Sequence, residues 1–226
     1  MMSCISNTIQ FHEFLNLVLV VPICNKSAKV LWPTCCHSFS ICLINKSMSS
    51  CICLGPKRAG KTHLLMALQD PDSIDSTSYS MPTIGTGIYR INFPVQSPSG
   101  DSNPNKHLPK SIQILEIGGS MAPLWRQYFE DVKKLIYVVD TSNLCQISAA
   151  GVLFYSILTE PRLQKVKILL VLSKMDYSYR QMRNEALLML QMSKLQKQIR
   201  QQVTIVEASA VTKVGLDEIY QWLQRP

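Results

Sequence analysis

From residue 49 onward, short apolar runs bounded by turn residues alternate with stretches that have helical periodicity. This alternation is typical of βαβ units, which pack helices against a mostly parallel sheet. Two of the runs, 135–139 and 166–172, are continuously apolar, as expected for strands that are buried on both faces. The predicted strands cover 51–54, 88–93, 111–117, 135–139, 166–172 and 203–206.

The segments between these strands have the spacing of amphipathic helices. Residues 61–69, for example, place Leu64, Leu65 and Leu68 on one face. The pattern predicts one α/β domain at 49–226, with a six-stranded, mostly parallel sheet flanked by about five helices. The predicted helices include 61–69, 148–158, 180–201 and 216–223.

Two segments inside this domain lack such patterns and are predicted to be loops. Residues 71–87 are polar and contain several Pro and Ser residues. Residues 94–110 are rich in Pro, Ser, Asn and Gly, which favours a long mobile loop between two hairpin strands.

The first 48 residues do not fit the pattern of the rest. Their main apolar run, 14–24, is shorter than the roughly 20 apolar residues that a membrane-spanning helix needs. No Lys or Arg precedes this run, so the charged flank of a signal peptide is missing. We expect residues 1–48 to be poorly ordered or an artefact of the gene model, with Met48 as an alternative start. A weak membrane-associating segment is the other interpretation.

Composition and charge narrow the classes of partner. The formal net charge of +8 is spread thinly along the chain, which fits an anionic ligand or an acidic membrane surface. Because no basic helix or interleaved aromatic patch accompanies this charge, we expect no nucleic-acid partner. Seven of the eight cysteines lie at or before Cys53, whereas a disulfide framework would be spread through the fold. The domain is therefore predicted to be cytosolic and reduced.

The clearest chemical motif follows the first predicted strand. It has P-loop spacing, a Gly and four residues followed by Gly-Lys-Thr, and it also opens a predicted helix. The N–H groups of such a loop attract phosphates, Lys61 would neutralise the β- and γ-phosphate oxygens, and the Thr62 hydroxyl would ligate Mg²⁺. The side chains of Lys57 and Arg58 are expected to point to solvent. The predicted phosphate-binding residues are Gly55, Pro56, Lys57, Arg58, Ala59, Gly60, Lys61 and Thr62.

Three further motifs resemble those of a known family. Residues 82–85 read Pro-Thr-Ile-Gly, 116–119 read Glu-Ile-Gly-Gly, and 123–129 read Pro-Leu-Trp-Arg-Gln-Tyr-Phe. In this order and spacing they resemble ADP-ribosylation-factor-like small GTPases, and the similarity extends over 51–224. The resemblance implies the P-loop small GTPase fold and a guanine-nucleotide switch that binds GTP or GDP together with Mg²⁺.

The resemblance also assigns roles near the phosphates. Thr83 would reach Mg²⁺ and the γ-phosphate only in the triphosphate state, and Gly119 would donate its N–H to the γ-phosphate. Loss of that phosphate would release both loops. Glu116 stands where the family has an Asp that holds Mg²⁺ through water. The implied metal-binding residues are therefore Thr62, Thr83 and, through water, Glu116.

Residues that would read the base lie near the end of the chain. Asp176 stands where the family has an Asp that accepts two hydrogen bonds from guanine, and Lys174 would lie along the base and ribose. Ser173 replaces an Asn that contacts guanine and braces the P-loop, so affinity is expected to fall by about 1–2 kcal/mol. Ser209 and Ala210 match the family's last motif, in which the Ala210 N–H would meet guanine O6.

The sequence offers no secure catalytic residue. Ser120 occupies the position of the Gln that orients the attacking water in most relatives. Because a serine side chain is too short for that role, we expect very slow intrinsic hydrolysis, unless a partner supplies the missing groups. The longer arm of Glu116 is expected either to shift the metal or to displace a water.

The family resemblance also implies partners and a location. They are effector proteins, an exchange factor and an activating protein, with the chain in the cytoplasm or peripheral to membranes, including ciliary ones. N-myristoylation needs a Gly directly after the initiator Met, and this chain has Met2 there. If Met48 were the start, Ser49 would occupy that position, so no such lipid anchor is expected. Two alternatives remain open. One is a near-constitutively GTP-bound scaffold, and the other is a P-loop small-molecule kinase, for which we find no Arg-bearing lid.

Overall fold

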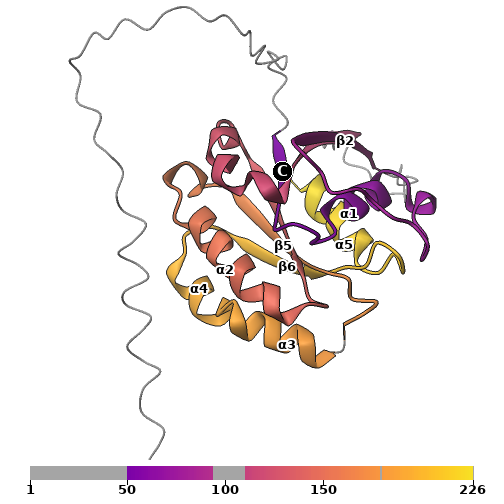
Figure 1. Cartoon of the computed structure of the whole chain (residues 1–226). Helices are drawn as coiled ribbons and strands as arrows, with labels where there is room; N and C mark the ends of the chain where they lie inside the picture. The colour runs from indigo at the N-terminus through magenta and orange to yellow at the C-terminus, as the bar shows by residue number, and fades with distance from the viewer. Residues whose placement is uncertain (1–49, 94–109, 179, 226) are drawn as a thin grey trace, which may run out of the picture. The chain divides into compact units, whose positions relative to one another are not determined.

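The computed structural model describes residues 50–93, 110–178 and 180–225, which form a six-stranded sheet between helices (Figure 1). The strand order is β2-β3-β1-β4-β5-β6, and only β2 runs antiparallel to its neighbour. This arrangement confirms the predicted α/β fold with a mostly parallel sheet. The strands are β1 (Cys51–Leu54), β2 (Thr86–Asn92), β3 (Ser111–Ile117), β4 (Lys134–Asp140), β5 (Lys167–Ser173) and β6 (Val203–Glu207).

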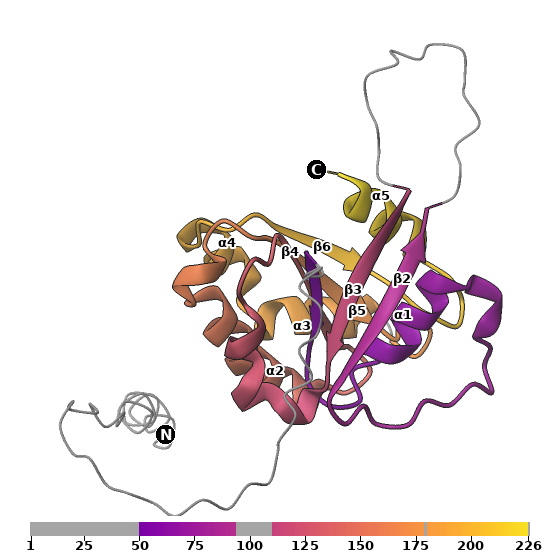
Figure 2. The ribbon, with the colours of Figure 1, turned by 90° about the horizontal axis from the view of Figure 1, so that it is seen from above.

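Helices cover both faces of the sheet, as Figure 2 shows from above. One hydrophobic core lies between the sheet and α1 and α5, and the other lies between the sheet and α2, α3 and α4. The central strands β1, β4 and β5 are almost entirely buried, as the continuous apolar runs of β4 and β5 predicted for those two strands. Within the described ranges the α-helices are α1 (Lys61–Gln69), α2 (Leu144–Leu158), α3 (Arg180–Met189), α4 (Met192–Gln198) and α5 (Leu216–Gln224).

The prediction of a single helix over 180–201 was wrong, because the chain breaks at Gln191. This residue has a left-handed backbone, with φ of 50°, between α3 and α4. The break is stabilised by tertiary contacts, since the Tyr155 hydroxyl of α2 donates to the Leu190 carbonyl at 3.0 Å. Leu190 and Met192 on either side are both buried in the core against α2. Packing therefore overrides a helical pattern that continues through the break.

Other element boundaries differ from the predicted ones by a few residues. Helix α2 begins at Leu144 rather than at 148, and β2 begins at Thr86, inside the segment predicted to be loop. Residues 1–48 and most of the predicted loop at 94–110 lie outside the described residues. The ends that flank this loop are paired, since the Phe93 N–H donates to the Lys110 carbonyl at 3.0 Å. In the described part of the chain, every helix is too short or too polar to cross a membrane.

Candidate functional site

The P-loop connects β1 to α1 and has a backbone that requires glycine at two positions. Gly55 has φ of 148°, and a Cβ there would lie 2.3 Å from the Val138 carbonyl oxygen of β4. Gly60 has φ of 85° and caps the N-terminus of α1. Left-handed φ values are strained for residues with a Cβ, so both glycines are needed for the loop to curl tightly at the end of the sheet.

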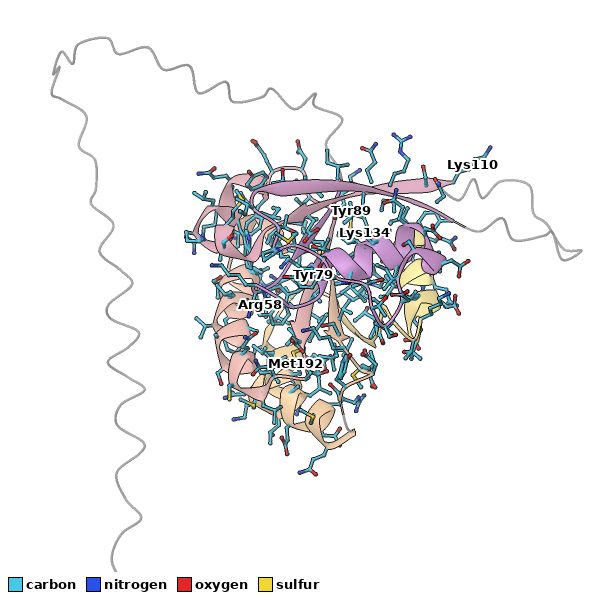
Figure 3. The ribbon with its side chains drawn as sticks, turned by 45° about the vertical axis from the view of Figure 1, so that its right-hand side comes forward. Arg58, Tyr79, Tyr89, Lys110, Lys134 and Met192 are labelled. Carbon is cyan, nitrogen blue, oxygen red and sulfur yellow. The ribbon has the colours of Figure 1, made fainter. Side chains whose placement is uncertain are left out.

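Lys61 lies in the first turn of α1 with its side chain folded under this loop. It is 5% exposed, and its ammonium donates to the carbonyls of Gly55 at 3.0 Å and Pro56 at 2.8 Å. Burial lowers the pKa of Lys61, and the nearby Glu116 carboxylate is among the charges that oppose this shift. Lys57 and Arg58 are exposed, as expected, and Arg58 is labelled in Figure 3.

The three residues predicted to bind the metal come together from separate segments. Thr62 lies in α1, Thr83 precedes β2, and Glu116 lies in β3. The Glu116 Oε1 atom accepts hydrogen bonds from the Thr62 hydroxyl at 2.8 Å and the Thr83 hydroxyl at 3.2 Å. Glu116 is 1% exposed, and its Oε2 atom has no hydrogen-bond partner among the described residues.

This oxygen-rich group fits Mg²⁺, which prefers hydroxyl, carboxylate and phosphate oxygens. A buried carboxylate oxygen without a partner is costly, and a cation beside it would offset that cost. The described residues contain no group of three or more His, Cys, Asp or Glu side chains that could hold a metal ion. Mg²⁺ in nucleotide-binding proteins is bound by one or two protein oxygens together with phosphate oxygens, and Thr62, Thr83 and Glu116 offer oxygens of this kind.

Tyr89 is a neighbour of Glu116 that sequence reasoning missed. In the β2–β3 ladder Gly87 pairs with Glu116, and the Tyr89 ring lies so close to Gly87 that an added Cβ would be 3.1 Å from the ring. Burial, followed by the charge of Glu116, raises the pKa of Tyr89 to about 12. Tyr89, labelled in Figure 3, packs its half-buried ring against the core that α1 and α5 form with the sheet. No local motif predicts this contact, because it depends on the register of two strands.

Two neighbouring glycines bring the segments around the phosphate site into close contact. The Gly118 N–H donates to the Gly85 carbonyl at 2.9 Å, and a Cβ on Gly118 would lie 2.5 Å from the Thr83 carbonyl oxygen. A Cβ on Gly119 would lie 2.4 Å from the Lys57 nitrogen of the P-loop. Both positions therefore require glycine for packing. The exposed Ser120 follows them at the start of the 3₁₀ segment Gly119–Tyr128, which is kinked at Met121.

The residues predicted to read the base surround a cavity of about 160 Å³ at the ends of β5 and β6. Ser173, Lys174, Asp176 and Ala210 line it, together with Gly60 and residues of the segment after α1. Ser209 is buried behind this lining, and its hydroxyl donates to Asp176 Oδ1 at 2.7 Å. The fold thus brings together the predicted base-reading residues, with Ser209 orienting Asp176.

Asp140, at the end of β4, is a second residue that sequence reasoning missed. Its Oδ2 atom accepts a hydrogen bond from the Lys174 ammonium at 2.6 Å, and its Oδ1 atom accepts one from the Ser142 N–H at 2.9 Å. Lys174 has φ of 60°, a backbone that side chains rarely adopt, so this ion pair helps to hold it at the cavity. An Asp directly after a buried apolar run was the signal that could have identified it.

Ser173 contacts the P-loop although its side chain is shorter than Asn. Its hydroxyl is buried and lies 2.6 Å from the Ala59 carbonyl oxygen and 3.0 Å from that of Val139. Because a hydroxyl has one hydrogen, it can donate fully to only one of these carbonyls at a time. The link between the base-reading segment and the P-loop is therefore retained here by serine.

Replacing Ser173 with Ala should lower the free energy of unfolding by about 1–2 kcal/mol, because it leaves two buried carbonyls without this donor. Chemical denaturation of the full chain measures this change. The control is Ser156→Ala, whose hydroxyl also donates to a backbone carbonyl but lies on the exposed side of α2. Equal effects of the two substitutions would show that the contact with Ala59 adds nothing.

Comparison with known proteins adds to this picture. Residues 37–226 match the model of the ADP-ribosylation factor family. The chain is 27% identical over 180 residues to human ADP-ribosylation factor-like protein 16. This match covers 77% of this chain and 84% of the human protein. It is 29% identical over 174 residues to ADP-ribosylation factor-like protein 3 of Chlamydomonas reinhardtii, covering 76% of this chain and 86% of that protein.

A solved structure has the same fold. It is the Arl6 BBS3 small GTPase from Trypanosoma brucei with the bound nucleotide analogue GppNp. The likeness has a TM-score of 0.58 and 17% sequence identity, and it covers 77% of this chain and 94% of the other. At this identity the comparison establishes the arrangement of strands and helices.

Proposed function

The chain belongs to the ADP-ribosylation factor family, and from this premise we propose that it is a guanine-nucleotide switch with very slow intrinsic hydrolysis. The observation that carries the proposal is the arrangement around the P-loop. The loop that would bind the phosphates leads directly into Thr62, which contacts Glu116, as Thr83 also does. Gly60 of the same loop lines the cavity beside Asp176. A single nucleotide with its metal would contact all three parts.

The P-loop would bind the phosphates through its N–H groups and Lys61. The Lys61 ammonium has three N–H donors, and two of them contact the Gly55 and Pro56 carbonyls. The third donor would remain for a phosphate oxygen. Mg²⁺, when bound, would supply further positive charge to the phosphate oxygens.

The switch would lie in the segments that carry Thr83 and Gly119. Thr83 would bind the metal when the γ-phosphate is present, and Gly119 would donate its N–H to that phosphate. Thr83 already contacts Glu116, and Gly85 contacts Gly118, so the two segments support one another. The ordered pair would form the surface that effector proteins bind.

The base would enter the cavity beside β5 and β6. Asp176, oriented by Ser209, would accept the two hydrogen bonds that guanine offers and adenine does not. Identification of the nucleotide that copurifies with the full chain tests the proposal directly. We expect GTP or GDP, and bound ATP would contradict the guanine assignment.

Hydrolysis is expected to be slow because the exposed Ser120 cannot reach and orient a water as a Gln does. Replacing Ser120 with Gln should therefore raise the single-turnover rate of phosphate release by roughly tenfold, since positioning accounts for much of this catalysis. Quenched samples of the GTP-loaded chain measure the rate. Ser120→Ala is the control and should match the natural chain. A wild-type turnover within minutes would refute our interpretation of Ser120.

A near-constitutively GTP-bound scaffold is the second candidate. It is favoured by Ser120 and by the contact of Thr83 with Glu116, which is made by protein groups alone. The same assay separates the two functions. GTP that persists for hours in the natural chain supports the scaffold, whereas slow conversion to GDP supports the switch.

Partners and location follow from family analogy. We propose that effectors, an exchange factor and an activating protein act on the chain, and that it works in the cytoplasm or peripherally on membranes, including ciliary ones. Imaging of the tagged full chain beside membrane and ciliary markers would test the location. A uniform distribution that does not respond to nucleotide state would count against the membrane role.

A further inference from the structure

Glu116 is one methylene longer than the Asp that this position has in most of the family, and the extra length places its carboxylate among the metal-binding hydroxyls. Its Oε1 atom lies 2.8 Å from Thr62 Oγ1 and 3.2 Å from Thr83 Oγ1. The two hydroxyl oxygens are themselves 3.0 Å apart. The three oxygens therefore form a nearly equilateral triangle.

The sides of this triangle are hydrogen bonds, and they also match the size of one face of a magnesium coordination octahedron. Mg²⁺ holds oxygen ligands at about 2.0–2.1 Å, so neighbouring ligands lie roughly 2.9 Å apart. The separations of 2.8, 3.0 and 3.2 Å bracket that value. An Asp that acts through water would instead keep its carboxylate about one water diameter further from the metal.

Within the described ranges no ion pair neutralises the charge of Glu116, although the charge of Lys61 lies near enough to interact with it. The Lys61 ammonium donates to backbone carbonyls instead. The Oε2 atom is buried without a hydrogen-bond partner in the described part of the chain. A bound metal would offset the cost of burying this negative charge, whichever of the two carboxylate oxygens contacts it.

We infer that Glu116 coordinates the divalent cation directly through Oε1 and replaces one of its water ligands. This inference rests on the proposed function, since it needs a nucleotide and metal at the P-loop. It revises the expectation that Glu116 acts through water. The metal would therefore have one water ligand fewer than it would have with an Asp at this position.

The number of water ligands can be counted with Mn²⁺ in place of Mg²⁺. The full chain is loaded with GDP and Mn²⁺, and the broadening of the Mn²⁺ electron paramagnetic resonance lines is measured in ¹⁷O-enriched water. We expect one water ligand fewer in the natural chain than in Glu116→Asp. The control is Glu218→Asp, which shortens an exposed carboxylate on α5 and should match the natural chain.

Equal water counts in the natural chain and Glu116→Asp would overturn the inference. If Glu116→Asp does not retain Mn²⁺ and GDP, the count in the natural chain decides. Because Thr83 is proposed to bind the metal only in the triphosphate state, the other ligands in the GDP complex are Thr62 and a phosphate oxygen. Direct coordination by Glu116 then leaves about three waters in the octahedron, and coordination through water leaves about four. If the natural chain retains no GDP, the proposed function itself fails, and this inference fails with it. That outcome differs from a GDP complex with the full set of waters.

Discussion

Replacing Lys61 with Ala should lower the affinity for GTP and GDP by a factor of roughly ten to a hundred and fifty. The ammonium is buried beneath the P-loop, where hydrogen bonds to charged groups contribute about 1.5–3 kcal/mol each. Alanine removes the charge as well as the donors, so the phosphates would lose their strongest protein contact. Titration of the nucleotide-free full chain with a fluorescent guanine nucleotide measures the change.

The matched control for this prediction is Lys57→Ala. Lys57 belongs to the same loop and has the same charge, but its side chain is exposed, so its removal should change affinity by less than about threefold. Thermal unfolding of both variants without nucleotide checks that each is folded. Similar losses of affinity in the two variants would mean that general positive charge, rather than the buried ammonium, holds the phosphates.

Replacing Asp176 with Asn should change the preferred base from guanine to xanthine. The carboxylate would accept hydrogen bonds from guanine N1–H and the 2-amino group. An amide can still accept from N1–H, but its NH₂ group faces the 2-amino donor and matches the 2-oxo group of xanthine instead. We expect a relative shift of about a hundredfold or more, measured by competition between GTP and XTP for the full chain.

The structure makes this exchange a test of the base-reading role. The Ser209 hydroxyl donates to Asp176 Oδ1 at 2.7 Å, and an amide oxygen at the same place can accept that bond. The substitution should therefore leave the surroundings of the cavity in place. Asp217→Asn, on the exposed start of α5, is the control. An unchanged preference in Asp176→Asn, with its fold intact, would rule out base reading by this residue.

Some parts of the fold were predictable because their signals are local. The run 135–139 is apolar without interruption and forms the buried strand β4, as predicted. Helix α1 has the predicted bounds, since a P-loop Gly precedes it and the apolar residues repeat on one face. The break at Gln191 was not predictable in this way, because it depends on Tyr155 and on the core beneath the two helices.

The candidate site divides in the same way. The motifs identified which residues form the site, but they did not show how Ser173 and Glu116 would contact their neighbours in place of the family's Asn and Asp. Ser173 was expected to weaken the brace of the P-loop, and the structure places its hydroxyl 2.6 Å from the Ala59 carbonyl oxygen. Glu116 was expected to act on the metal through water, which stays a prediction, and the structure adds that its carboxylate accepts hydrogen bonds from two hydroxyls. Motif spacing identifies positions but does not show how far each side chain reaches.

The sequence by itself determined the order of strands and helices, the P-loop and the segments that would contact phosphate and base. Each of these depends on apolar periodicity or on residues close together in the chain. Only the tertiary structure decided how Thr62 meets Thr83 and Glu116, which lie 21 and 54 residues further along. Their distances follow from strand register and from the packing of α1 on the sheet, and no local pattern encodes either.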